Sequence, residues 1–233
     1  MIEILAFDAD DTLWHSEIHF RDAQQAYERI LAHYLDVADA VVHQRLLEVE
    51  RRNVKRFGYG AKGMTLSMIE AAITLTEGRI SGHHVQAILE IGHGVLEHPV
   101  ELLPHVEETV AELAKRQVLV LITKGDLFHQ EAKVARSGMG RYFRRIEIVS
   151  EKDVPTYQRL LEELNVSPDR FMMVGNSPKS DIQPVLALGG HGVLIPYPIL
   201  WEMERSEPIS PDTPRFAQVA DIRQIPALLD RFA

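Results

Sequence analysis

Residues 4 to 13 read Ile4-Leu5-Ala6-Phe7-Asp8-Ala9-Asp10-Asp11-Thr12-Leu13. The apolar residues at the start of this stretch predict a strand, and a cluster of carboxylates follows it directly. Clustered carboxylates repel one another at neutral pH unless a cation or a phosphoryl-bearing ligand compensates their charge. An Asx turn or a helix cap after an edge strand would also account for these acids. The rest of the chain decides between the two interpretations.

Two later apolar runs also end in polar residues. Val118-Leu119-Val120-Leu121-Ile122 leads into Thr123-Lys124-Gly125-Asp126, and Phe171-Met172-Met173-Val174 leads into Gly175-Asn176-Ser177-Pro178-Lys179-Ser180-Asp181. The carboxyl ends of parallel strands open on one edge of a sheet. We therefore expect the three strand exits to converge on one crevice, which favours a functional site over a simple turn.

The order and spacing of these segments resemble the haloacid dehalogenase (HAD) superfamily. Asp8-Ala9-Asp10-Asp11-Thr12 is similar to its first motif, Thr123 to its second, Lys152 to its third, and the segment from Gly175 to Asp181 to its fourth. One position differs, because Asn176 stands where an aspartate is more usual. The resemblance implies an α/β fold with a Rossmann-like parallel-sheet core, formed by residues 1–14 and 98–233, and a small all-helical cap domain, residues 15–97, inserted after the first strand.

The inserted segment has a helical pattern of its own. Its first apolar face is formed by Phe20, Ala23, Tyr27, Ile30, Leu31 and Tyr34, and further helices are expected around residues 42–49, 67–73 and 85–91. Between the second and third helices, residues 51–63 combine three glycines with aromatic and basic side chains. A basic helix end followed by a glycine-rich turn is one interpretation of this stretch. Substrate contact through Arg52, Tyr59 and Lys62 is the other, and we include these residues in the candidate substrate-binding set.

The resemblance implies phosphoryl-transfer chemistry at the strand exits. Asp8 is expected to attack phosphorus and form an aspartyl-phosphate, which water then hydrolyses. Asp10 is expected to protonate the leaving group and then deprotonate the attacking water. Thr123 and Lys152 are expected to stabilise the phosphoryl oxygens. Lys124 is a candidate for phosphate binding, with a rim or surface charge as the alternative.

The expected cofactor is Mg²⁺. Magnesium prefers oxygen ligands and is usually bound by one or two carboxylates together with substrate oxygens. The candidate ligands are Asp8, the backbone carbonyl of Asp10, Asp181 and Asn176. The amide oxygen of Asn176 would be a neutral ligand, and the alternative is that Asp181 provides this side of the site alone.

These expectations together predict a magnesium-dependent phosphatase that acts on a small phosphorylated metabolite. A phosphomutase or phosphotransferase of the same superfamily is an alternative, because it would keep all four motifs. A non-catalytic binding or regulatory module that retains the fold is a second alternative, and Asn176 is the feature that favours it. A haloacid dehalogenase would not need an acid–base carboxylate at position 10, so Asp10 argues against that reaction.

Composition limits the possible partners and compartments. The chain has 233 residues, 45% apolar content and a formal net charge of −9, which argues against nucleic acid or an anionic membrane as the main partner. Its apolar runs are far shorter than the ~20 residues of a membrane-spanning helix, and its amino end lacks the basic start of a signal peptide. The chain has no cysteine, which fits the cytoplasm. We expect a monomer or a homodimer.

Overall fold

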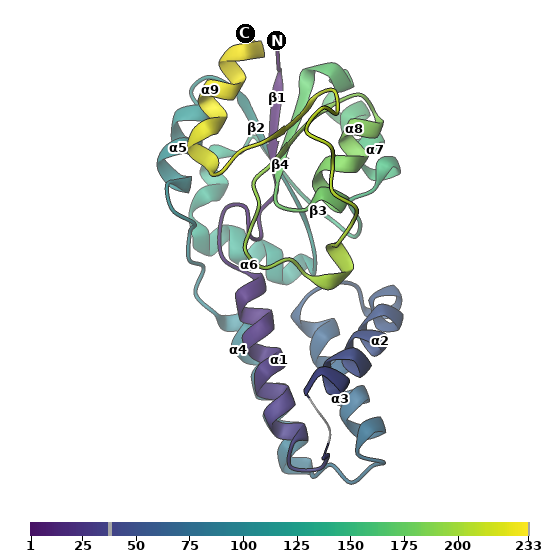
Figure 1. Ribbon diagram of the computed structural model, residues 1–233. Helices are drawn as coiled ribbons and strands as arrows, with labels where there is room; N and C mark the ends of the chain where they lie inside the picture. Colours follow the sequence, from purple (N-terminus) through teal and green to yellow (C-terminus); the bar gives the residue numbers. More distant parts are fainter. Residues whose placement is uncertain (37–38, 233) are drawn as a thin grey trace. The chain divides into compact units, whose positions relative to one another are not determined.

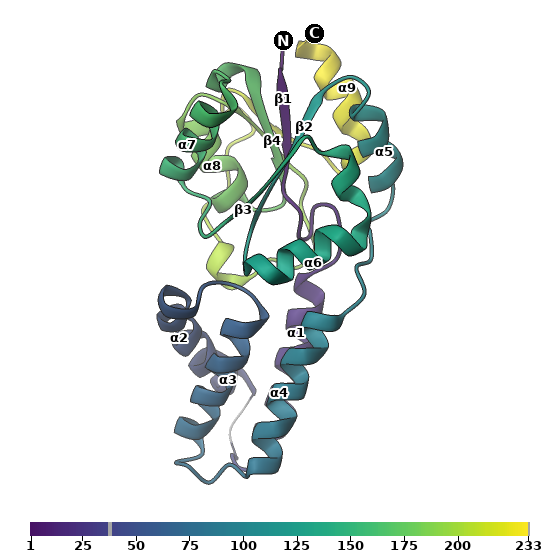
Figure 2. The same ribbon diagram turned by 180° about the vertical axis from the view of Figure 1, so that it is seen from behind.

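The computed structural model describes residues 1–36 and 39–232, without the side chains of residues 39 and 40. The chain divides into two compact units, Met1–Glu17 with Val100–Ala233, and Ile18–Pro99. The boundaries expected from the sequence, after residues 14 and 97, lie a few residues before these. Figures 1 and 2 show a unit with a central sheet and a unit made of helices.

The first unit contains one parallel sheet with the strand order β3-β2-β1-β4-β5-β6. The strands are β1 (Ile4–Phe7), β2 (Val118–Lys124), β3 (Arg145–Val149), β4 (Phe171–Gly175), β5 (His191–Leu194) and β6 (Phe216–Gln218). The chain winds outward from β1 through β2 to β3, then returns to β4 on the other side of β1. β1 and β4 are therefore neighbours at the point where the winding direction reverses. Ligands of open α/β sheets bind at the carboxyl ends of the strands at such a point.

Helices cover both faces of this sheet (Figure 1). One face packs against α5 (Val106–Leu113), α6 (Leu127–Ser137) and α9 (Ile225–Leu229), and the other against α7 (Val154–Leu164) and α8 (Gln183–Ala187). Leu5 and Phe7 of β1 point to the first face, and Ile4 and Ala6 point to the second. Because side chains alternate across a strand and both faces are covered, the whole strand is apolar. This explains why β1, β2 and β4 stand out in the sequence as continuous apolar runs.

Shorter helical turns connect the larger elements of the first unit. They are η1 (Met139–Tyr142), η2 (Pro168–Arg170), η3 (Pro178–Ile182), η4 (Glu202–Glu204), η5 (Ile222–Gln224) and η6 (Asp230–Phe232). Two of them matter for the site: η3 directly follows the exit of β4, and η4 lies in the long segment after β5.

The strand register places the predicted site residues at one edge of the sheet. Phe7, the last residue of β1, is paired with Leu121 of β2 and Val174 of β4. Asp8 is therefore level with Ile122 and Gly175, one residue before Thr123 and Asn176 on the neighbouring strands. Parallel pairing alone thus brings the first, second and fourth motifs together.

The second unit consists of α1 (Glu17–Leu31), α2 (Asp39–Phe57), α3 (Ala61–Leu75) and α4 (Gly82–Glu97), with α1 beginning at the end of the first unit. Its apolar core includes Tyr27, Met68 and Ile88, which are fully buried. Helices α3 and α4 approach closely at Gly92, where an added Cβ would lie 2.0 Å from the Thr65 hydroxyl oxygen. The four helices agree with the helical pattern of the sequence. Within the described residues, no helix has the length and apolar character needed to cross a membrane.

Candidate active site

Asp8, Lys152 and Asp181 form a buried ionic cluster at the exits of β1, β3 and β4. The Lys152 ammonium lies 2.5 Å from Asp8 Oδ1 and 2.7 Å from Asp181 Oδ1. All three side chains are less than a tenth exposed. Thr12 adds a hydroxyl that donates to Asp8 Oδ2 at 3.2 Å. The structure thus brings together the candidate nucleophile, the third-motif lysine and the fourth-motif aspartate.

The charges of this cluster are strongly coupled. Burial raises the pKa of Asp8 to about 7, and the nearby Asp181 carboxylate adds to this effect, while Lys152 opposes it. Burial alone would lower the pKa of Lys152, but the two carboxylates outweigh it and raise the value. One ammonium therefore faces two carboxylates in a low-dielectric site, and the cluster keeps an affinity for further positive charge.

Asp10 has a separate set of partners. Lys133 of α6 donates to both of its carboxylate oxygens at 2.6 Å, and the Trp14 indole N–H donates to Oδ1 at 2.7 Å. Gln130 donates to Oδ2 at 3.1 Å. Burial opposes ionisation of Asp10, but Lys133 and these hydrogen bonds outweigh it and lower its pKa. Asp10 is therefore a carboxylate with both oxygens occupied by donors.

Thr123 lies beside this network and is almost fully buried. Its hydroxyl oxygen accepts a hydrogen bond from Gln130 Nε2 at 2.7 Å. Because that oxygen is the acceptor, the Thr123 proton points elsewhere and is suited to donate to a phosphoryl oxygen. Gln130 thus links the second motif to Asp10.

The fourth motif is held by a tight turn between β4 and η3. Asp181 Oδ2 accepts a hydrogen bond from the Ser177 backbone N–H at 2.9 Å. Gly175 is needed for this turn, because an added Cβ would lie 2.2 Å from the same carboxylate oxygen. The Asn176 amide oxygen is 3.4 Å from the Thr12 hydroxyl, which donates toward it. Asn176 therefore lies next to the Asp8 cluster, with its oxygen on the same side as Thr12.

Asp11 has a local structural role. It has a left-handed backbone with φ 61°. Its carboxylate accepts from the backbone N–H groups of Ser16 and Glu17 at 2.8 and 3.1 Å, which caps the start of α1.

Lys124 lies in a second, largely buried ion pair next to the motifs. Its ammonium is 2.7 Å from Glu204 Oε1 and 3.1 Å from Glu151 Oε1, and it also donates to Ser180. Glu204, from η4, accepts hydrogen bonds from the Ser177 and Ser180 hydroxyls. The structure places the Lys124 charge between these carboxylates, and phosphate binding by Lys124 remains a prediction. This pair fixes the segment after β5 to the turn that carries Asp181.

The three candidate substrate residues of the helical unit occupy different places within it. Arg52 lies in α2 and forms an ion pair with Glu70 of α3, while Tyr59 lies in the turn between these helices and Lys62 in the first turn of α3. Gly58 and Gly60, on either side of Tyr59, have positive φ angles of 72° and 102°. The glycines thus shape the turn that presents Tyr59. Substrate contact by these residues remains a prediction.

Several residues of the site were not predicted from the sequence. They are Trp14, Gln130, Lys133, Ser177 and Glu204. Gln130 and Lys133 had the clearest available signal, because two polar residues three positions apart fall on one face of α6 and that face is buried. Glu204 lies in an irregular segment without periodicity, where nothing marks it as buried.

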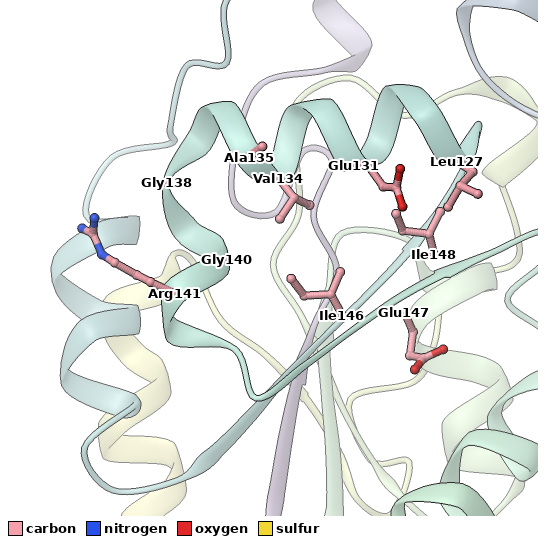
Figure 3. Close-up of a pocket in the computed structure, with 10 residues that line it drawn as sticks. All are labelled: Leu127, Glu131, Val134, Ala135, Gly138, Gly140, Arg141, Ile146, Glu147 and Ile148. Carbon is pink, nitrogen blue, oxygen red and sulfur yellow. The ribbon is translucent and has the colours of Figure 1, made fainter.

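A separate hollow of about 670 Å³ lies between α6 and the edge strand β3 (Figure 3). Val134, Ile146 and Ile148 form its apolar wall, with Glu131, Glu147 and Arg141 around it. None of the predicted site residues lines it. The catalytic candidates therefore belong to the strand-exit cluster and not to this hollow.

The strand-exit carboxylates, the buried lysine and the reversal of winding define a hydrolase of the HAD type. A family model described as haloacid dehalogenase-like hydrolase matches residues 2–189, so the chain belongs to this family. The comparison with curated proteins found no match.

Solved structures agree with this assignment. A haloacid dehalogenase-like family hydrolase from Xanthomonas campestris is 50% identical, with a TM-score of 0.89 over 99% of this chain and 91% of that one. A 2-haloacid dehalogenase from Pseudomonas syringae pv. Tomato is 22% identical, with a TM-score of 0.65 over the whole of both chains. A HAD hydrolase from Bacillus subtilis bound to magnesium is 15% identical, with a TM-score of 0.64 over 98% and 99% of the chains. The latter two show a shared fold alone.

Proposed function

We propose that this protein is a magnesium-dependent phosphatase that hydrolyses a small phosphorylated metabolite through an aspartyl-phosphate on Asp8. The observation that carries the proposal is Asp10, an acid–base candidate two residues from Asp8 whose carboxylate is held by three side chains. Cleavage of a phosphate ester releases an alkoxide that needs a proton, whereas a halide leaves without one. Asp10 therefore favours a phosphatase over the 2-haloacid dehalogenase reaction named for a structural neighbour.

The donor set at the strand exits fits Mg²⁺. Two buried carboxylates, Asp8 and Asp181, with the Asn176 amide oxygen nearby, are oxygen ligands of the kind that magnesium prefers. Among the side chains that the structure describes, no group of three His, Asp or Glu is arranged to hold a metal. A site with few carboxylates suits magnesium, which keeps water and substrate oxygens as ligands. The magnesium bound to the Bacillus subtilis hydrolase supports the same choice.

Different residues of the chain carry out the different steps of the proposed reaction. Asp8 attacks phosphorus, the ester bond breaks, and Asp10, which enters this step in its protonated form, gives its proton to the leaving oxygen. The Asp10 carboxylate held by its three donors is the state that follows this transfer. Asp10 then takes a proton from water, which attacks the aspartyl-phosphate and releases phosphate and the Asp8 carboxylate. Lys152 and the Thr123 hydroxyl stabilise the charge on the phosphoryl oxygens. When bound, Mg²⁺ would neutralise charge on the phosphoryl group as it approaches the Asp8 carboxylate.

A direct test compares the two reactions on the same protein. The purified chain with Mg²⁺ should release phosphate from members of a panel of phosphorylated metabolites and no halide from 2-chloropropionate. Asp8→Asn should lower phosphate release by about 10⁴-fold or more, because the nucleophile is lost. Asp22→Asn, an exposed aspartate of α1, is the matched control and should retain activity. Halide release without phosphate release would overturn the proposal.

Beryllofluoride gives a second readout that needs no known substrate. It mimics an acyl phosphate, so it should bind the wild type in the presence of Mg²⁺ and fail to bind Asp8→Ala. Equal binding to both proteins would contradict a phosphoenzyme on Asp8.

A further inference from the structure

Lys133 occupies an unusual place for a lysine. It lies in the middle of α6, and its side chain is only 8% exposed. Its ammonium lies 2.6 Å from each carboxylate oxygen of Asp10. A buried ammonium is costly unless it is paired, and an apolar side chain of similar volume often stabilises a fold at least as well. The demands of folding alone therefore do not explain a lysine at this position.

The other partners of Asp10 are Trp14, which follows β1, and Gln130, which lies on α6 with Lys133. Trp14, which is fully buried, donates its indole N–H to Oδ1, and its backbone carbonyl accepts from the Asp11 N–H at 2.7 Å. Gln130 donates to Oδ2 and is itself tied to Thr123. The carboxylate thus has donors from the β1 exit and from α6, and rotation of its plane would break several hydrogen bonds at once.

We propose that Lys133 is a positioning residue that holds the Asp10 carboxylate in one orientation for proton exchange with the leaving group and with water. This inference rests on the proposed phosphatase function. Lys133 acts through Asp10, and the buried Trp14 indole is a further donor to one of the same carboxylate oxygens. Catalytic groups need to be held within a fraction of an ångström of the productive geometry, and this requires neighbours whose own positions are fixed.

The decrease in kcat on loss of Lys133 should depend on the leaving group of the substrate. A basic leaving group depends on a well-oriented proton donor, whereas a good leaving group depends on it little. Lys133→Met should therefore lower kcat for phenyl phosphate by about 10²-fold and for para-nitrophenyl phosphate by less than about tenfold. Lys133→Arg, which restores a cation, should recover a large part of the loss. Lys115→Met, at an exposed lysine, is the matched control and should resemble the wild type. Equal losses on both substrates would overturn the proposal.

A double variant separates positioning from general damage to the fold. If Lys133 acts only through Asp10, Lys133→Met should cause no further loss of kcat in an Asp10→Asn background. The double variant also contains neither charge, so it avoids the unpaired carboxylate that the single variant leaves in the site. If the double variant lost kcat by the product of the two single-variant factors, Lys133 would act independently of Asp10, and this would contradict the inference.

Nuclear magnetic resonance tests the geometry without any activity. The chain has two tryptophans, Trp14 and Trp201, so it should give two indole N–H signals, which Trp201→Phe assigns. Lys133→Met should shift or broaden the Trp14 signal, and Lys133→Arg and Lys115→Met should leave it close to its wild-type position. An unchanged Trp14 signal in Lys133→Met would overturn the positioning role. The Trp14 signal can be measured even if the wild type releases no phosphate. Failure of the proposed function and failure of this inference are therefore distinguishable.

Discussion

At the scale of single residues, the site depends on one ammonium shared by two carboxylates. Lys152 lies between Asp8 and Asp181, and the Ser177 N–H holds the far oxygen of Asp181. Aspartate at position 181 is therefore fixed in place before any ligand arrives. A cation bound at this site would require the negative charge of Asp181 as well as its shape.

Changing the charge at positions 181 and 176 tests this requirement. Asp181→Asn keeps an oxygen for the Ser177 N–H but removes a charge, so it should weaken Mg²⁺ activation by at least tenfold. Asn176→Asp adds a charge beside the cluster and should tighten Mg²⁺ binding. The measurement is phosphate release against Mg²⁺ concentration, with Asp212→Asn, an exposed aspartate, as the control. An unchanged magnesium requirement in Asp181→Asn would mean that the metal site is misplaced.

Sequence patterns predicted the motif residues but not their partners. Asp8, Thr123 and Asn176 could be placed together because parallel strands bring their exits to one edge. Lys133 and Glu204 could not, because a single lysine or glutamate in a sequence is usually exposed. Their burial follows from the packing of α6 and η4 against the sheet edge, which depends on the whole fold. The ion pair of Lys124 could not be predicted from the sequence either, because its partner Glu204 is 80 residues away.

At the scale of elements, the Lys124–Glu204 pair joins η4 to the turn after β4. Burial alone would raise the pKa of Glu204, but Lys124 and the two serine hydroxyls outweigh it and lower the value from 4.5 to about 2. A carboxyl with a lowered pKa stabilises the folded state above its unfolded pKa. The contribution should be complete above about pH 5 and should be lost as the pH falls from about 4.5 to about 2.

Glu204→Gln should remove this contribution. At neutral pH the free energy of unfolding of the variant should be about 2 kcal/mol lower than that of the wild type, because Lys124 and the serines lose a charged partner. The difference should shrink as the pH falls from about 4.5 toward about 2, where the carboxyl of the folded wild type also becomes protonated. Urea unfolding at several pH values measures both quantities, with Glu207→Gln at an exposed site as the control. A difference that does not depend on pH would contradict the charged pair.

The pKa of Glu50, in α2, is shifted in the opposite direction to that of Glu204. Burial raises its pKa from 4.5 to about 7. The folded state therefore favours the protonated form, so this group's contribution is fully present below about pH 4.5 and is lost as the pH rises through about 7. Above that pH the helical unit contains a poorly solvated carboxylate.

Glu50→Gln should stabilise the protein at alkaline pH. The uncharged amide avoids the cost of burying a carboxylate, so the variant should gain about 2 kcal/mol over the wild type at about pH 8 and little at about pH 4. Circular dichroism of urea unfolding at both pH values measures this gain. Glu48→Gln, two residues earlier and exposed, should change stability by less than about 0.5 kcal/mol at either pH. A gain of the same size at both pH values would show that packing, and not charge, is responsible.

At the scale of the whole molecule, the chemistry and the inserted helices lie in separate units. Every residue proposed for phosphoryl transfer belongs to the unit formed by Met1–Glu17 and Val100–Ala233, and Arg52, Tyr59 and Lys62 belong to Ile18–Pro99. The sequence predicted this division because its periodicity changes from helical to alternating helix and strand near residue 100. β6, with three residues, was too short to leave a pattern. Phosphate and metal chemistry suit any phosphomonoester, so selectivity should depend on the other unit.

Substitutions in that unit should therefore separate selectivity from chemistry. Tyr59→Ala and Lys62→Ala should raise KM for the natural substrate, identified from the metabolite panel, by about tenfold or more, because binding energy from remote parts of the substrate is lost. Hydrolysis of para-nitrophenyl phosphate should stay within a few-fold, because the reacting centre is intact. Tyr59→Ala should have the larger effect if the leaving group is apolar or a ring, and Lys62→Ala if it carries a second anion. Arg45→Ala, an exposed arginine of α2, is the control. Parallel losses on both substrates would assign these residues to folding of the helical unit, and unchanged kinetics on both would remove them from the substrate-binding set.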